Sequence, residues 1–558
     1  MKFSNRSNYI LLGLLVLLNI ILRIPSYSHQ TGYDSFHTSI LANIISLYGY
    51  ARWWVHPLSI FGMYPYSYAS AVPFILSGIS QLSGLDMEIT VLLFDVFVGL
   101  LSIFTTYLLA GMIRDDDLFK FLVAFGCSTA QGMLVFTTWD ISTRGLFIVM
   151  LPLFTYLLLR VRINKLRAGM LAIMLLVLMA ATHHYVYFTF PIILSFFIII
   201  IGTKINKSIF FQRHCAKRNI RNSSRNGSIT SDCVSKKFKN ERFYPIRNNY
   251  SKICYLVLFI ITFSSPFFTH TFITAGSRYG WVIDMFIINM RYTGPLILLA
   301  FGGFTYLVLK HDKRPEDWFL LIILLLLIPF SYIQTYAHFI LFTFLFLFIG
   351  ISLTNIAHAY NRKRGYATFV IIASLFIAVS FSGFYQHWHT GMKGGRGDWR
   401  MTDETYIGAL WIKDNINPNK NMVGNGGVYN VRPQRMSAAS GGRPAILTSG
   451  STAALSYGFI NESYIKIKKN SPLTKEFYID NPYVEVRGRS IGGQLNWFSE
   501  ESDIDGWHAK RIIKEFNLSY MIEDTDIHDS IIRSVQRRKN SVYDSGKIRI
   551  WDLERGKK

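Results

Sequence analysis

The sequence is poor in cysteine and in acidic residues. Its 558 residues include four cysteines, and 34 Asp and Glu stand against 58 Lys and Arg. The cysteines are Cys127, Cys215, Cys233 and Cys254, and none forms a Cys-x-x-Cys pair. This argues against a disulfide framework or a zinc site built on paired cysteines, and it leaves the redox compartment open.

Charge of either sign is scarce, and apolar residues take its place. Only 16% of the residues are charged, whereas 51% are hydrophobic and 15% aromatic. Apolar runs long enough to cross a bilayer, roughly 17–25 residues, recur along the first two thirds of the chain. They predict about eleven membrane spans. These are 8–27, 88–112, 118–137, 144–161, 168–186, 187–203, 253–271, 292–310, 317–334, 337–356 and 367–385.

The net charge of +24 first suggests nucleic acid. The densest basic run, residues 204–252, lies between two predicted spans, however, so the positive-inside rule makes it a cytoplasmic loop. We therefore expect no nucleic-acid partner. The same rule places the N-terminus in the cytoplasm. Three segments then lie on the extracytoplasmic side of the membrane: loop 28–87, the turn "TTWDISTRG" and everything after about residue 386.

The chain divides at about residue 385. Residues 1–385 form the predicted transmembrane domain, and the segment 69–84 within it is too short to span, which favours an amphipathic or re-entrant helix on the outer face. Residues 386–558 contain Gly-rich loops, a helical run at 403–415 and strand-like runs such as "KIRIWDL". We expect a soluble, extracytoplasmic α/β domain there.

Two lone acids lie at the predicted outer rim. Asp34, in "TGYDSFHTSI", follows the first span, and Asp140, in "FTTWDISTRG", follows the third. Local explanations exist for both: Asp34 is a suitable helix N-cap, and Asp140 is spaced for a helical ion pair with Arg144. The alternative is that the two carboxylates meet.

Meeting carboxylates would repel by about 4 kcal/mol at 4 Å and an effective dielectric constant of about 20. A divalent cation would remove this cost, and hard oxygen ligands suit Mg²⁺ or Mn²⁺, which also bind phosphates. His37, one helical turn after Asp34, is a candidate third ligand or hydrogen-bond partner. The pattern favours a metal that neutralises a leaving phosphate.

Cations and histidines near the same rim are candidates for that phosphate. Arg52, Arg278 and Arg291 offer the planar fork that suits phosphate, although snorkelling to lipid headgroups is the plainer role. His183 and His184 end the fifth span, and ionisable groups at such depth are functional candidates by default. Asp95 lies deeper, and we expect it to be paired or protonated and structural.

Three features together resemble the GT-C superfamily of membrane glycosyltransferases. They are the acid after the first span in "GYDSFHTSILANIISLYGYARWW", the segment "YPYSYASAVPFILSGISQLSGL" and the acid in "WDISTRG". Many spans followed by an external α/β domain are similar to the oligosaccharyltransferase catalytic subunit. The motif-level likeness covers residues 31–85 and 137–146.

The resemblance implies a polyprenyl phosphate or pyrophosphate sugar donor. The family's metal-binding acids map to Asp34 and Asp140, and its lipid-phosphate arginine falls near His338, so that His338 or Arg291 would substitute. In the external domain "GNGGVYN" stands where the family's sequon-reading Trp-Trp-Asp-Tyr-Gly motif would be. No acceptor-binding residue carries over.

The leading hypothesis is therefore a GT-C enzyme that moves a sugar or oligosaccharide from a lipid carrier to a protein or glycan on the outer face. Asp34 and Asp140 would hold the metal, or Asp34 would act as general base. One alternative is a monosaccharide transferase of the mannosyltransferase or aminoarabinose transferase type, which the missing sequon motif favours. Another is a non-catalytic membrane receptor or assembly factor.

Overall fold

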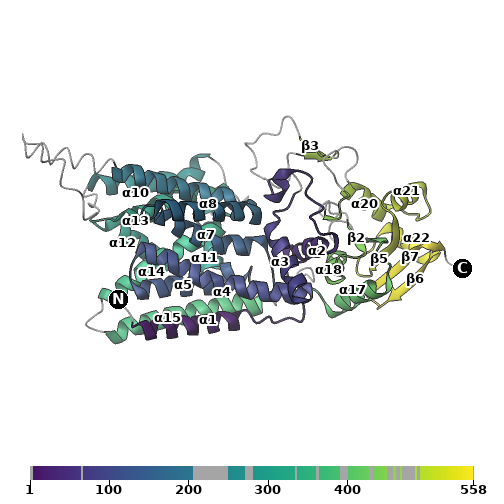
Figure 1. Cartoon of the computed structure of the whole chain (residues 1–558), viewed down its shortest axis with the longest axis horizontal. Coiled ribbons are helices and arrows are strands. Elements are labelled where there is room, and N and C mark those ends of the chain that lie inside the picture. The colour runs from purple at the N-terminus through teal and green to yellow at the C-terminus, as the bar shows by residue number, and fades with distance from the viewer. Residues whose placement is uncertain are drawn as a thin grey trace, which may run out of the picture.

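The structure, a computed structural model, consists of a bundle of long helices followed by a domain built around a mixed sheet (Figure 1). The N-terminus lies at the end of the bundle remote from the sheet, and the C-terminus lies at the far side of the sheet. The described residues are 4–63, 67–204, 249–269, 281–333, 336–359, 364–389, 400–426, 431–448, 456–459, 465–467, 484–486 and 491–556.

Eight helices in these residues are long and apolar enough to cross a membrane. A ninth span results if α11 (Trp281–Thr293) and α12 (Ile297–Leu309), which bend by 104° at a short break, count as one. The eight helices are α1 (Asn5–Leu22), α4 (Met87–Ile113), α7 (Thr143–Arg160), α8 (Lys165–Thr182), His184–Lys204, α13 (Pro315–Ile333), α14 (Ala337–Ala359) and α15 (Arg364–Gly383). They confirm a multi-pass helical membrane protein.

The predicted span 118–137 is wrong as a single span. Helix α5 (Asp117–Thr129) ends where Ala130 adopts an extended conformation with ψ of 149°, and the four-residue α6 (Gln131–Leu134) follows. Thirteen helical residues reach only about 20 Å, less than a bilayer core. The chain from residue 130 is therefore free to turn and carry Asp140 toward the first loop. Helix α10 (Asn249–Thr269) contains residues 253–269 of the predicted span 253–271, but its apolar part is shorter than a candidate span. The predicted span 292–310 is wrong as a straight helix, because it includes the break between α11 and α12.

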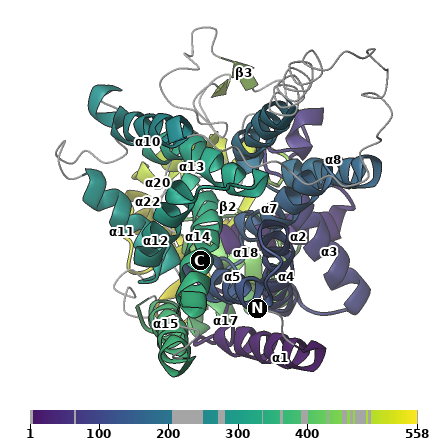
Figure 2. The same ribbon diagram turned by 90° about the vertical axis from the view of Figure 1, so that its left-hand side faces the viewer.

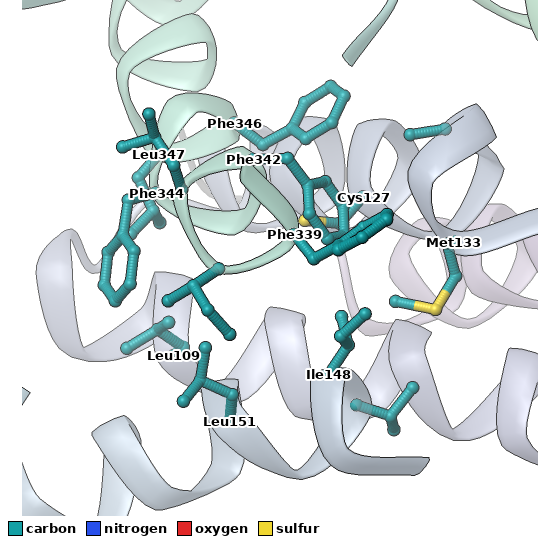
Figure 3. Close-up of a cluster of buried hydrophobic side chains, with 14 of the residues drawn as sticks. Leu109, Cys127, Met133, Ile148, Leu151, Phe339, Phe342, Phe344, Phe346 and Leu347 are labelled. Atoms are coloured by element: carbon teal, nitrogen blue, oxygen red, sulfur yellow. The ribbon is translucent and has the colours of Figure 1, made fainter. Parts of the chain in front are cut away.

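Helix α14 lies at the centre of the bundle, and α1, α8 and α15 lie at its edge (Figure 2). Phe339, Phe342, Phe344 and Phe346 of α14 are buried against α5, α6 and α7 (Figure 3). The large Phe346 ring of α14 packs against Gly126 of α5. A Cβ on Gly126 would lie 2.5 Å from that ring, so only glycine fits there.

The loop after α1 folds as a layer between the bundle and the sheet (Figure 1). It contains α2 (Tyr33–Tyr48), the short 3-10 helix η1 (Pro57–Ile60) and α3 (Ala71–Ser83), whose thirteen residues confirm the short helix expected at 69–84. The apolar side of α2 shares one buried core with the C-terminal domain, including Phe36, Ile40 and Ile44 against Val423 and Leu447. The first loop and the last domain are thus one packed unit.

The C-terminal domain has a five-stranded sheet in the order β2-β1-β5-β7-β6. The parallel strands β1 (Asn421–Gly424), β2 (Ala445–Leu447) and β5 (Leu518–Asp524) adjoin the antiparallel β6 (Lys539–Asp544) and β7 (Ile548–Gly556). Its helices are α17 (Asp403–Asn415), α18 (Arg432–Ala439), α20 (Ile491–Glu500), α21 (Trp507–Glu515) and α22 (Ser530–Arg538), and β3 (Ile465–Ile467) pairs with β4 (Val484–Val486). The sheet and α17 confirm the expected α/β character.

Candidate functional site

The loops that carry Asp34 and Asp140 are hydrogen-bonded to each other. The backbone N–H of Thr31 donates to the carbonyl of Trp139 at 3.0 Å, and the N–H of Ile141 donates to Oγ of Ser35, also at 3.0 Å. Trp139 takes a left-handed conformation with φ of 54°, which turns the chain at this junction. The two loops are therefore joined by hydrogen bonds on either side of each acid.

Asp34 lies in the first turn of α2 and is not its N-cap. The cap is Gly32, with φ of 88°, so the local explanation for Asp34 is wrong. Its Oδ2 lies 3.1 Å from Nη1 of Arg144, in the first turn of α7, and 44% of the Asp34 side chain is exposed. Arg144 thus pairs across loops with Asp34, whereas the sequence spacing suggested a local pair with Asp140.

The Asp140 carboxylate packs directly against the start of α2. A Cβ built on Gly32 would lie 1.8 Å from its Oδ1, so only glycine leaves room for it. Burial raises the pKa of Asp140 well above its usual range, and the neighbouring Asp34 carboxylate raises it further, while Arg144 opposes both effects. When both carboxylates are ionised, one guanidinium leaves an excess negative charge, which either a proton on Asp140 or a further cation compensates.

Two cavities meet at the Asp34–Arg144 pair. Asp34, Ser142 and Arg144 line both of them. The histidine cavity, of about 270 Å³, is lined by Asp34, His37, Thr38, Leu41, Gly62, Ser67, Tyr68, Ala69, Ser142, Thr143, Arg144, His183 and His184. The arginine cavity, of about 460 Å³, is lined by Tyr33, Asp34, Val135, Phe136, Asp140, Ser142, Arg144, Arg291, Tyr292, Phe339 and Val431.

His37 lies on the other side of the pair from Asp140. It lines the histidine cavity, its ring centroid is 4.4 Å from that of Tyr68, and Asp140 lines the arginine cavity. No group of three or more His, Cys, Asp or Glu side chains in the described ranges is arranged to hold a metal ion. Among the described residues, Asp34, Asp140 and His37 therefore do not form such a group.

Burial lowers the pKa of His37 to about 4, although the nearby Asp34 carboxylate opposes the shift. Between pH 6.5 and 4 the unfolded chain therefore binds a proton at this residue that the folded chain does not, so stability falls as the pH falls. Through His37 the wild type loses about 2 kcal/mol of unfolding free energy between pH 7 and pH 5. We expect the His37→Gln variant to lack this part of the loss. Unfolding transitions of both proteins in detergent at the two pH values measure this. An identical loss in both would contradict the burial of a neutral imidazole.

The candidate phosphate ligands occupy separate places. Arg291, at the end of α11, lines the arginine cavity. Arg52 instead lies over the Tyr48 ring, 4.3 Å from its centroid, and lines neither cavity. His338 is buried in α14, where its Nδ1 lies 3.3 Å from Oδ1 of Asn289. Arg278 lies outside the described residues.

A buried polar network supports the Asp140 loop from the bundle side. Arg23, at the end of α1, is 1% exposed, and its Nε donates to Oγ1 of Thr137 at 3.0 Å, while its Nη1 donates to Oδ1 of Asn19 at 2.7 Å. Asp95 of α4 is equally buried, and the nearby Arg23 guanidinium attracts its carboxylate, whereas the Asp140 carboxylate repels it. Asp95 therefore has the charged partner that its position required.

Arg144 and Ser142 are the residues that the sequence analysis missed as site residues. Both line both cavities. The signal that could have found Arg144 is its place in the first turn of a spanning helix, four residues after Asp140. His183 and His184, expected to be functional from their depth, do line the histidine cavity.

No protein-family model and no curated protein sequence matches the chain. Solved structures do match, and they give it the fold of the GT-C membrane glycosyltransferases. The oligosaccharyltransferase of Archaeoglobus fulgidus, in complex with Zn and sulfate, has a TM-score of 0.56 at 12% identity, over 97% of this chain and 73% of that one.

The same archaeal enzyme, AglB, in complex with an inhibitory peptide and a dolichol-phosphate, matches with a TM-score of 0.56 at 10% identity, over 98% and 74% of the two chains. The mycobacterial arabinofuranosyltransferase AftD matches with a TM-score of 0.51 at 12% identity, over 99% of this chain and 40% of that one. These likenesses establish the fold.

Proposed function

We propose that the protein is a membrane glycosyltransferase that takes a sugar from a polyprenyl-phosphate-linked donor and transfers it to a protein or glycan on the outer face. The observation that carries the proposal is the convergence of Asp34 and Asp140, from two separate loops, on one Arg144 between two cavities. The GT-C fold supports it, as does the dolichol-phosphate in the AglB complex.

The side chains divide the work of the reaction. The acceptor heteroatom forms a bond to the anomeric carbon of the sugar, the bond from that carbon to the phosphate oxygen breaks, and its electron pair leaves with the phosphate. The half-exposed Asp34 carboxylate faces both cavities, so it can accept the proton that the acceptor loses. Arg144 orients that carboxylate, and Ser142 offers a hydroxyl to either cavity.

One or two carboxylates together with substrate phosphate oxygens form the usual Mg²⁺ site, so Asp34 and Asp140 are the residues that would hold the cation. The burial of Asp140 beside a second carboxylate favours such a partner. Mg²⁺ or Mn²⁺ held there would neutralise the charge that develops on the leaving phosphate. His37 is not needed as a ligand.

A single-sugar transferase is the second candidate, because the loop that would read a peptide sequon has a structural use here. Asn425 Oδ1 accepts from the N–H of Asp524 at 2.7 Å, and the N–H of Gly426 donates to Oδ2 of Asp529 at 2.6 Å. The other residues of "GNGGVYN" after Gly426 lie outside the described ranges. The mass added to the product separates one sugar from many.

The test replaces the native gene with one that encodes Asp140→Asn and compares the cells by mass spectrometry of lipids and glycoconjugates. A transferase predicts that one glycosylated product disappears while its lipid-linked sugar accumulates, whatever the identity of the sugar. A receptor or assembly factor predicts that neither changes while the protein stays in the membrane. Unchanged lipids and glycans at normal protein abundance would therefore overturn the proposal.

A further inference from the structure

Two arginines from distant parts of the chain converge on one aromatic ring, at the end of α2 opposite to Asp34. The guanidinium carbon of Arg52 lies 4.3 Å from the ring centroid of Tyr48, and that of Arg443 lies 5.2 Å from the same centroid. The two guanidinium carbons are therefore no farther apart than the sum of these distances. Arg52 belongs to the first loop, whereas Arg443 belongs to the turn between α18 and β2.

Close backbone packing holds both arginines where they are. A Cβ on Gly442, next to Arg443, would lie 3.5 Å from the Asn43 side chain, so this turn packs directly on α2. A Cβ on Gly458 would lie 3.0 Å from Nε of Arg52, so the backbone of a third segment packs on that guanidinium. The fold of the first loop against the last domain thus brings the two cations together.

The two guanidinium groups lack a counter-charge within the described part of the chain. Neither forms an ion pair or a hydrogen bond with a described residue. The Tyr48 ring attracts each cation, but it carries no net charge that could offset their mutual repulsion. The planar forks of two arginines suit a carboxylate or a phosphate. The pair therefore fits an oxyanion.

Exposed aromatic rings flank Arg52 in the same loop. The backbone N–H of Trp54 donates to the carbonyl three residues earlier at 3.1 Å, which closes a turn around Arg52. Trp53 is buried, and its indole N–H donates to Oγ of Ser70 at 3.2 Å, so the turn is anchored at the start of α3. Tyr50 and Trp54 are exposed. Such amphipathic rings suit a ligand with apolar faces and polar edges, as a sugar has.

The position of Arg443 distinguishes this cluster from an aromatic belt at the membrane interface. Arg443 lies two residues before β2, and Figure 1 shows α2 between the bundle and the sheet that contains β2. At 1.5 Å per residue, Tyr48 lies about 21 Å along α2 from Asp34. A sugar in solution can reach the sheet side of α2, whereas lipid headgroups lie on the bundle side.

We propose that Arg52 and Arg443 form a binding site for an acidic saccharide, whose oxyanion lies between the two guanidinium groups. The exposed rings of Tyr50 and Trp54 offer faces for the adjoining sugar units. The site goes beyond the proposed transfer reaction, because it lies a helix length from Asp34 and uses no residue of the two cavities. It binds an acidic glycan to the outer layer without taking part in bond making.

The test measures binding of a hyaluronan tetrasaccharide, which carries glucuronate carboxylates, and of its carboxyl-reduced form to the purified full chain in detergent. The wild type is expected to bind the acidic form about five- to twentyfold more tightly, as half-exposed charge-assisted contacts predict. Arg52→Gln and Arg443→Gln should each lose most of this preference. Arg52→Lys keeps the charge without the fork and should keep part of it.

Arg400→Gln is the matched control. Arg400 also lies over a tyrosine ring, 3.7 Å from the centroid of Tyr27, and its Nη2 donates to the Tyr27 hydroxyl at 2.7 Å. No second guanidinium among the described residues shares that ring. The control variant should therefore bind the acidic tetrasaccharide as the wild type does.

Three results would overturn the proposal. One is a wild type that binds both tetrasaccharides equally. Another is a pair of variants, Arg52→Gln and Arg443→Gln, that melt at a lower temperature but keep the preference, since the arginines would then only hold α2 in place. The third is inorganic phosphate or dihexanoyl phosphatidylglycerol that binds as tightly as the tetrasaccharide, which would assign the site to a free anion or a lipid headgroup. No sugar is transferred in these measurements, so their outcome leaves the proposed function untouched.

Discussion

Asp34→Asn is expected to lower the rate of sugar transfer by about 10²–10⁴-fold, the contribution typical of one positioned general base. A neutral amide can neither accept the acceptor's proton nor help to hold a cation beside Asp140. The shape of the side chain is preserved, so the substrates can still enter both cavities. The measurement is the transfer rate with saturating lipid-linked donor in membranes that contain equal amounts of each protein.

Asp86→Asn is the matched control for this variant. Asp86 is an exposed acid at the N-terminus of a spanning helix, as Asp34 is at the start of α2, but it makes no side-chain capping bond and lines neither cavity. It should keep full activity. Full activity of Asp34→Asn alongside it would remove the chemical centre of the proposed mechanism.

Gly32→Ala is expected to lower the transfer rate by about 10²-fold although it removes no charged group. The added Cβ would lie 1.8 Å from Oδ1 of Asp140, so the carboxylate must move, and a displacement of about 1 Å at a reacting centre costs about that much. The φ of +88° at Gly32 also strains any L-residue, and this strain would lower stability by about 1–2 kcal/mol.

Gly49→Ala separates the two effects. Gly49 ends the same helix with φ of 78°, and an added Cβ would meet nothing within 4 Å. It should lose similar stability and keep its activity. Equal transfer rates in the two variants, compared at equal amounts of folded protein, would show that the position of the Asp140 carboxylate does not affect transfer.

The sequence predicted the long helices because apolar length is a local property. Eight of the expected spans coincide with helices long enough to cross a membrane. The sequence-based prediction failed at 118–137. The apolar residues there are continuous, but the helix ends before Ala130, and hydropathy alone does not reveal that break. Whether the C-terminal domain forms a separate unit from residue 386, and which side of the membrane each end faces, are still predictions.

The site was harder to predict because its contacts are not local. Asp34 and Asp140 were paired through family resemblance and position, and nothing in their spacing required it. Arg144 was assigned to Asp140 from a four-residue separation, but α7 begins only at Thr143, so the two residues do not share a helical face. Tertiary contacts decide which carboxylate Arg144 pairs with. Here the contact is the backbone hydrogen bond from Thr31 to Trp139, which joins the two loops.

The burial of α2 against the last domain has a consequence for biogenesis. The apolar face of α2 is synthesised near the beginning of the chain, but its partners Val423 and Leu447 come near the end. Until Val423 and Leu447 are synthesised and delivered to the same side of the membrane, the apolar face of α2 is exposed and Asp34 is not held in position. The protein would therefore acquire its chemistry only after residues 421–447 have been synthesised, which keeps shorter chains inactive.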